Sequence, residues 1–129
     1  VKTLRPSIRV IGAEPREVAR FAASRAAGDR VAVASAATIA DGLRGQQPGV
    51  LTWDAASRYV DAFVSVDDTA LLEAVRRLYL DAHLVVEPSG AIALAALLSG
   101  SVPERPAVAV VSGGNLDPAL LASILSLAT

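Results

Sequence analysis

Three short segments of the sequence place hydroxyl, carboxylate and glycine residues where they could contact a small ligand. The segment Ser112-Gly113-Gly114-Asn115 follows an apolar run and precedes Asp117-Pro118, a pair typical of the start of a helix. Glycines allow the backbone to approach a ligand closely, and the Ser112 hydroxyl can donate or accept a hydrogen bond. An ordinary turn of small residues between a strand and a helix shows the same pattern, so the spacing leaves both interpretations open.

The other two segments are equally short. Glu87 ends an apolar run and precedes Pro88-Ser89-Gly90, so its carboxylate either caps a helix or faces a ligand, and capping is the more frequent outcome. Residues 38–42, Thr-Ile-Ala-Asp-Gly, lie in a long loop. There the pattern of an ordinary turn predicts that Asp41 bonds to its own backbone and that Gly42 adopts a positive φ. Each segment taken alone predicts little about function.

Together and in this order, the motifs resemble the fold-type II pyridoxal-phosphate enzymes, and in particular the branch of threonine/serine dehydratase and serine racemase. The resemblance covers essentially the whole chain, and the segment from Thr38 to Leu43 favours the dehydratase branch. The matching segments are Ile11-Gly12-Ala13-Glu14-Pro15, Thr38-Ile39-Ala40-Asp41-Gly42-Leu43, Val85-Val86-Glu87-Pro88-Ser89-Gly90-Ala91 and Ser112-Gly113-Gly114-Asn115-Leu116-Asp117.

The resemblance implies that the last motif contacts the cofactor, pyridoxal 5'-phosphate. Ser112 would share a hydrogen bond with the pyridine nitrogen, and Gly113, Gly114 and Asn115 would shape the edge of the ring. A neutral hydroxyl does not hold that nitrogen protonated as a carboxylate would, which suits β-elimination.

The same resemblance places Asp41 and Gly42 along the cofactor cleft, with Gly42 offering close backbone approach. It also places Glu87 near the bound amino acid, as a cleft-lining residue rather than as the acid or base of the reaction. No catalytic residue is assigned within this chain.

Glu14 is the one candidate metal ligand. It matches the first ligand of a divalent-cation site in some relatives, whose other ligands would fall at the Val18 carbonyl and the Arg20 side chain. A guanidinium cannot bind a cation, so this set is incomplete. The alternative is that Glu14 stabilises the N-terminus of a helix.

The resemblance also implies two features that have no match here. The lysine that forms a Schiff base with the cofactor and the glycine-rich loop that binds its phosphate lie upstream of these motifs in the family. The only lysine, Lys2, matches a surface helix end instead. We therefore expect residues 1–129 to be the C-terminal portion of a catalytic domain, and we expect this chain alone to be inactive.

The function implied by the resemblance is a pyridoxal-phosphate-dependent ammonia-lyase that converts threonine or serine into a 2-oxo acid and ammonia. Two alternatives within enzymes are a serine or amino-acid racemase and a β-replacement enzyme. A third is a truncated, non-catalytic remnant that acts as a binding or interaction module. The expected partners are a small amino-acid substrate and either further copies of the chain or the missing N-terminal portion of the same enzyme.

These motifs require an α/β fold to position them. Strands that alternate with helices predict a parallel twisted sheet with crossover helices, as in the large domain of the fold-type II enzymes but incomplete. The expected strands are residues 8–13, 31–34, 62–66, 84–87 and 107–111, and the last should be buried on both faces. The expected helices are residues 15–28, 53–59, 68–82, 91–98 and 118–125, with the N-cap of the third at Asp67 or Asp68.

Composition excludes several classes of protein. The 129 residues correspond to about one domain, and 53% apolar content excludes disorder. Twelve basic and 13 acidic residues leave no basic stripe for nucleic acid or an anionic membrane. The chain lacks cysteine, and no apolar run reaches the roughly 18 residues of a membrane span. A soluble, cytoplasmic protein is expected.

Overall fold

The computed structural model describes residues 1–103 and 105–126. The strands are β1 (Ile11–Pro15) and β2 (Ala62–Val66), and two short 3-10 turns are η1 (Arg16–Val18) and η2 (Asp41–Leu43). The helices are α1 (Arg20–Ala27), α2 (Val50–Tyr59), α3 (Asp68–Leu80), α4 (Pro88–Leu98) and α5 (Pro118–Ser126).

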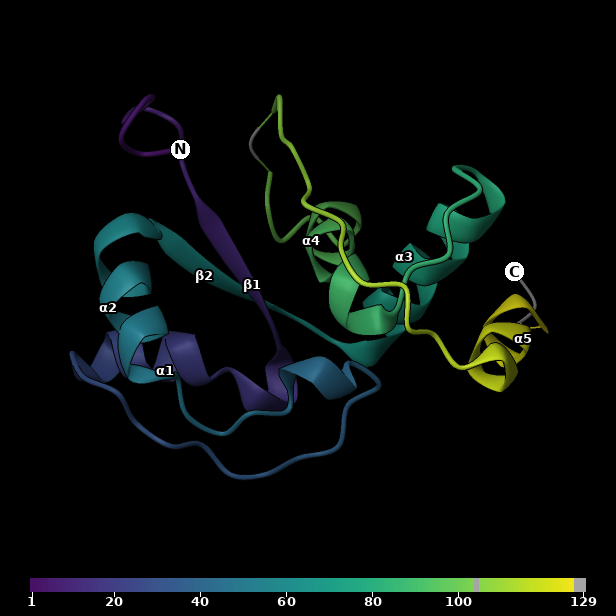
Figure 1. Cartoon of the computed structure of the whole chain (residues 1–129), viewed down its shortest axis with the longest axis horizontal. Helices are drawn as coiled ribbons and strands as arrows, with labels where there is room; N and C mark the ends of the chain where they lie inside the picture. The colour runs from purple at the N-terminus through teal and green to yellow at the C-terminus, as the bar shows by residue number, and fades with distance from the viewer. Residues whose placement is uncertain (104, 127–129) are drawn as a thin grey trace.

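The two strands run parallel and form the centre of an α/β arrangement. Ile11 lies opposite Ala62, and Pro15 lies opposite Val66. Parallel neighbours need a crossover connection, which here contains α1 and α2. Helices α1 and α2 lie on one side of the strand pair, whereas α3 and α4 lie on the other (Figure 1). The predicted fold class, parallel strands with crossover helices, is confirmed.

The core lies between α3, α4 and the strands. Leu71 and Val75 of α3 and Ala91 and Ala95 of α4 are all completely or almost completely buried, and the cluster continues to Ile124 of α5. The alanines of α4 let it pack closely against both α3 and the strand pair. The apolar face of α3 follows the helical spacing that predicted it.

The start of α3 depends on one carboxylate. Asp67 Oδ1 accepts a hydrogen bond from Ala70 N at 3.0 Å, so Asp67 is the N-cap. Asp68, the other residue that the sequence left open for this task, is the first residue of the helix and makes different contacts.

Three expected strands are wrong. Residues 31–34, 84–87 and 107–111 have no strand structure, and the predicted burial of the last is also wrong, because Val108 is 93% exposed and Val110 is 73% exposed. A strand exists only where a neighbour completes its ladder of hydrogen bonds. In residues 1–103 and 105–126 only β1 and β2 provide one for each other.

Other elements are shifted. The first strand covers Ile11–Pro15 rather than residues 8–13, since it forms where β2 lies beside it. The first helix is split at Ala19, whose ψ of 62° separates η1 from α1. Helix α2 begins at Val50, and α4 begins at Pro88, which occupies the first helical position.

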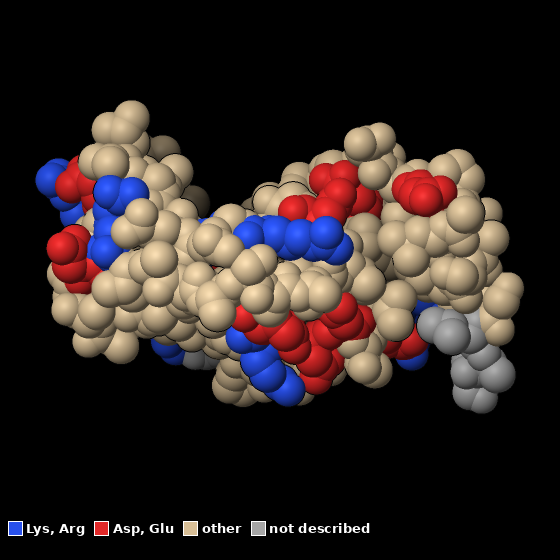
Figure 2. All heavy atoms as spheres, turned by 90° about the horizontal axis from the view of Figure 1, so that it is seen from below, with Lys and Arg blue, Asp and Glu red and all other residues tan. Residues whose placement is uncertain are grey.

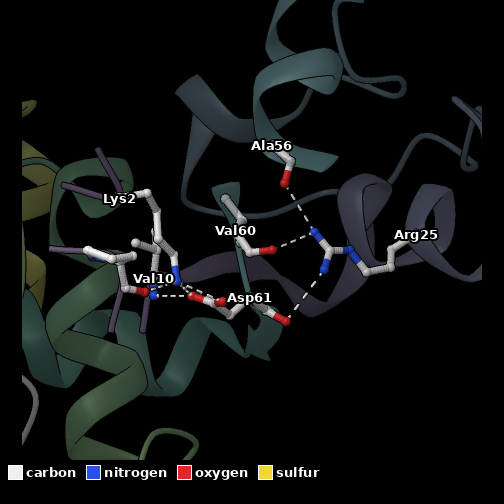
Figure 3. A network of polar contacts seen from close by, with 7 residues as sticks. Lys2, Val10, Arg25, Ala56, Val60 and Asp61 are labelled. Carbon is white, nitrogen blue, oxygen red and sulfur yellow. Dashed lines mark hydrogen bonds and ion pairs between the residues drawn. The ribbon is translucent and has the colours of Figure 1, made fainter. Parts of the chain in front are cut away.

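A polar network ties the chain start and α1 to the beginning of β2 (Figure 3). Asp61 accepts hydrogen bonds from Lys2 Nζ at 2.8 Å and from Val10 N at 2.7 Å. The Arg25 guanidinium donates to carbonyl oxygens of the last turn of α2 and of the α2–β2 connection, at 3.1 Å for Ala56, 2.7 Å for Val60 and 3.4 Å for Asp61. It also stacks over the Phe63 ring at 4.9 Å. The network fixes where β2 begins relative to β1.

Because of this network, we expect the free energy of unfolding to fall as the pH becomes acidic. The hydrogen bond from Lys2, and next that from Val10 N, lowers the pKa of Asp61 below its ordinary value of 3.8. A lowered folded-state pKa stabilises the fold fully above the unfolded value and loses that contribution as pH falls through the folded value. We expect Asp61→Asn to remove this part of the acid destabilisation in urea titrations at several pH values. Asp54→Asn, which removes only an exposed ion pair with Arg58, is the control.

The turn that follows α3 contains a strained residue. His83, three residues beyond the last residue of the helix, has a φ of 57°, and Leu84 N donates to Leu78 O at 2.8 Å. The backbone conformation of His83 therefore turns the chain back toward the end of α3.

Glycine adopts this conformation without strain, so His83→Gly should raise the free energy of unfolding by about 0.5–1 kcal/mol. The matched opposite change is Gly28→Ala, because Gly28 ends α1 with a φ of 75° and its missing Cβ would meet no neighbouring atom. That variant should be destabilised by about 1 kcal/mol in the same urea titration. An unchanged or lowered stability of His83→Gly would contradict the assignment.

Candidate functional site

Two of the three motif segments meet at the N-terminus of α4. Gly42 N, in η2, donates a hydrogen bond to Ser89 Oγ at 3.0 Å. A Cβ on Gly42 would lie at that same 3.0 Å from the hydroxyl, so a larger residue would crowd the contact. Asp41 is exposed, and its Oδ1 also accepts from Gly42 N at 2.7 Å, so the expected bond of Asp41 to the local backbone is present. The positive φ expected at Gly42 is wrong, because this residue lies within the right-handed 3-10 turn η2.

The third segment reaches the same helix end along the extended stretch that precedes α5 (Figure 1). Glu87 N donates to Gly113 O at 3.3 Å, and Ser112 N donates to Gly90 O at 3.4 Å. A Cβ on Gly90 would lie 1.4 Å from the Ser112 carbonyl oxygen, which no rearrangement of a side chain could relieve. Gly90 is therefore required for the two segments to touch.

Glu87 occupies the N-cap position of α4, but its side chain does not accept a cap hydrogen bond. Its carboxylate lies against Gly113 instead: a Cβ on Gly113 would be 2.1 Å from Glu87 Oε1. Gly113 also has a φ of 71°, which glycine adopts without strain. Of the two roles that the sequence left open for this carboxylate, capping of the helix by its side chain is wrong, and contact with a ligand stays a prediction.

Ser112 is exposed beside this end of α4, and Asn115 is exposed three residues further along the chain. The part of the chain that the structure describes leaves the Ser112 hydroxyl open to a ligand. No contact joins Asn115 to the other candidate residues within that part, so it is near the segment only by sequence.

These residues fit the pyridoxal phosphate that the resemblance implies. A flat ring can lie against backbone that carries no side chains, and the exposed glycines Gly113 and Gly114 offer such a stretch. The space that a Cβ would take is filled by Glu87 at Gly113 and borders Val85 O at Gly114. The ring nitrogen needs one polar partner, and Ser112 offers a neutral, accessible hydroxyl. The donor set in the described residues is thus suited to the edge of the ring and its nitrogen.

Glu14 does not join this site. Its side chain is 4% exposed, and its two carboxylate oxygens accept hydrogen bonds from Phe21 N at 2.8 Å and Ala22 N at 2.9 Å. Arg20, at the position of an expected cation ligand, instead donates to Leu43 O at 2.7 Å. The interpretation of Glu14 as a residue that stabilises the N-terminus of α1 is confirmed. Residues 1–103 and 105–126 contain no group of three candidate ligands for a metal ion.

One residue that holds the site was missed from the sequence. Asp68 accepts hydrogen bonds from Thr38 Oγ1 at 2.5 Å and from Ile39 N at 3.0 Å, and so ties the loop before η2 to the start of α3. The Asp67-Asp68 pair was visible in the sequence, but it signalled only a helix cap. The 30-residue separation of Asp68 from Thr38 carries no local signal.

On the face shown in Figure 2, basic and acidic side chains lie beside one another in small groups between large neutral areas. None of the described helices has the length and apolar content of a membrane span.

Comparisons with known proteins agree with the motifs. A family model described as pyridoxal-phosphate dependent enzyme matches residues 1–113. The chain is 42% identical over 127 residues to a serine racemase from Oryza sativa subsp. indica, covering 93% of this chain and 37% of that protein. It is 36% identical over 121 residues to a catabolic L-threonine dehydratase of Escherichia coli strain K12, covering 91% and 37%.

Solved structures show the same arrangement. A threonine deaminase from T.th. superposes with a TM-score of 0.85 at 38% identity, covering 91% of this chain and 43% of that one. The chain thus spans well under half the length of each of these relatives. The family match over residues 1–113, the shared fold and the converging motifs lead to one conclusion: this chain belongs to the pyridoxal-phosphate dependent enzyme family.

Proposed function

We propose that this chain is the C-terminal portion of the catalytic domain of a threonine or serine ammonia-lyase, and that it forms one wall of the cofactor cleft. The observation that carries the proposal is the convergence of three motif segments at the N-terminus of α4, through Gly42 N to Ser89 Oγ and Glu87 N to Gly113 O. The relatives named as threonine dehydratase and threonine deaminase support the reaction class.

Pyridoxal phosphate supplies, when bound, the electron-withdrawing ring that lets an amino acid lose its α-proton and β-hydroxyl. The residues of this chain orient that ring. The Ser112 hydroxyl, exposed beside Gly113, is placed to share a hydrogen bond with the ring nitrogen. Because a hydroxyl is neutral, the nitrogen does not gain the proton that a carboxylate partner would stabilise, and this favours elimination.

The glycines and Glu87 shape the rest of the wall. Gly113 and Gly114 let the backbone reach the ring edge, while the Glu87 carboxylate lies against Gly113 and lines the cleft. Gly42, which contacts Ser89 at the same helix end, would border the cleft as well, and Asp41 is exposed beside it. These side chains bind and orient, and the substrate is a small hydroxy amino acid.

A racemase is the second candidate, because the rice relative at 42% identity is named serine racemase. The two functions share the same cofactor wall and differ in the fate of serine. Incubation of the protein at its full natural length with L-serine separates them: an ammonia-lyase forms ammonia and a 2-oxo acid, whereas a racemase forms D-serine. A protein that forms neither product would support the non-catalytic alternative.

The 129-residue chain mixed with pyridoxal phosphate should show no stable, borohydride-reducible absorbance band and no turnover. The physical reason is that the Lys2 amine lies near the chain start and pairs with Asp61 at the surface, so it is not a desolvated nucleophile. The absorbance spectrum before and after borohydride is the measurement. A reducible band that peptide mapping assigns to Lys2 would overturn the proposal that the anchoring lysine lies elsewhere.

Ser112→Ala, in the protein at its full natural length, should weaken binding of pyridoxal phosphate by about 5- to 10-fold, because one hydrogen bond to the ring is lost. Fluorescence titration of the apoprotein measures this. Ser99→Ala is the matched control, because Ser99 lies just beyond the other end of α4 and its hydroxyl contacts only Ala96 O and Ser101 in the described chain. Equal affinity of the Ser112 variant and the control would remove Ser112 from the site.

A further inference from the structure

We propose that Asp68 is a positioning residue for the cofactor cleft, which holds the loop of residues 38–42 so that Gly42 reaches the N-terminus of α4. This proposal rests on the proposed function, in which Gly42 borders the cleft that binds the cofactor. Asp68 itself touches neither Gly42 nor Ser112 through any hydrogen bond in the described chain, so its action is indirect.

The first step is the pair of hydrogen bonds that join Asp68 to the loop. One carboxylate oxygen accepts from Thr38 Oγ1 at 2.5 Å, and the other accepts from Ile39 N at 3.0 Å. Hydrogen bonds to an ionised carboxylate are about twice as strong as neutral ones. Thr38 is 3% exposed, so water competes little for the bond.

The second step is the connection from Thr38 to the η2 turn. Thr38 Oγ1, while it donates to Asp68, accepts from Ala40 N at 3.2 Å. Ala40 is fully buried, and its carbonyl accepts from Leu43 N at 2.9 Å, which closes the η2 turn. The Thr38 hydroxyl thus holds the backbone of Ala40, and Ala40 is the residue whose carbonyl starts the η2 turn.

The third step is the contact with the site. Gly42, in the middle of η2, donates to Ser89 Oγ in the first turn of α4 at 3.0 Å. Arg44 holds the loop from the other side by donating to Thr38 O from Nε at 3.0 Å and from a terminal nitrogen at 2.6 Å. Without Asp68 the Thr38 hydroxyl proton and Ile39 N lose their acceptors, and only the hydrogen bonds from Arg44 to Thr38 O still hold the start of the loop. We therefore expect η2 to move more freely and Gly42 to contact Ser89 less often.

The adjacent residue provides a matched control. Asp67 is also a carboxylate at the start of α3, but it caps that helix through Ala70 N and pairs with Arg16 at 3.5 Å. Asp67→Ala therefore weakens α3 without releasing the loop. Asp68→Ala releases the loop and leaves the cap in place. Asp68→Asn keeps the shape and can still accept one hydrogen bond, so it is the conservative variant.

The experiment uses the protein at its full natural length and two measurements on each variant. Hydrogen exchange of the amides of residues 39–43 reports the loop, and fluorescence titration with pyridoxal phosphate reports the cleft. For Asp68→Ala we expect exchange of this segment to rise by about tenfold or more and cofactor affinity to fall by about tenfold. Asp68→Asn should recover part of both losses. Asp67→Ala should lower the melting temperature while cofactor affinity stays within about twofold.

Each outcome decides the proposal. Unchanged exchange at residues 39–43 in Asp68→Ala overturns it, whatever the cofactor does. Faster exchange with unchanged cofactor affinity overturns the link to the cleft, and an equal loss of affinity in Asp67→Ala reduces Asp68 to a general stabiliser. If the unchanged protein bound no pyridoxal phosphate, the proposed function would fail, and the exchange data alone would decide whether Asp68 holds the loop.

Discussion

The close approach of two backbone segments at the N-terminus of α4 is the constraint on which the site depends. Ser112 N donates to Gly90 O, and the Ser112 carbonyl oxygen occupies the space that a Cβ on Gly90 would fill. A side chain at Gly90 would push the two segments apart, because its Cβ would overlap a backbone oxygen that cannot rotate away as a side chain could. The glycine therefore determines that the segment carrying Ser112 and Gly113 lies against the helix, and with it the position of every residue proposed to contact the ring.

Helix α3, the strand pair and the loop of residues 38–42 hold α4 and its N-terminus in place. Helix α4 packs against both α3 and the β1–β2 pair, through alanines small enough for close packing. The loop of residues 38–42 is held by Asp68 and by Arg44, and reaches α4 through one hydrogen bond to Ser89. Three parts of the chain that are far apart in sequence thus share one helix end. The helix packs into the core, whereas Asp41, Gly42, Ser112 and Gly113 are exposed.

The extended segment 107–111 shows how much of this fold depends on neighbours. Its residues have the apolar pattern of a buried parallel strand, yet Val108 and Val110 face solvent and no ladder forms among the described residues. The pattern describes a strand with both faces covered and both edges paired. The described residues supply neither, and the solved threonine deaminase in which the fold recurs extends well beyond the part that this chain matches. The apolar pattern alone therefore did not predict whether a strand forms here, because that depends on neighbouring strands.

The sequence by itself determined the elements whose signals are local. The alternation of residues 62–66 predicted β2, the helical spacing after Asp67 predicted α3, and the Asp117-Pro118 pair predicted the start of α5. It also determined the family, because four ordered motifs are a pattern of residue identity that needs no coordinates.

Only the tertiary structure decided that Asp67 caps α3 and that the adjacent Asp68 binds a loop 30 residues away in sequence. It likewise decided that Glu87 lies beside Gly113 instead of capping its own helix. The physical reason is the same in both cases: a carboxylate has several possible donors within reach, and only the packing of distant segments determines which donors are there.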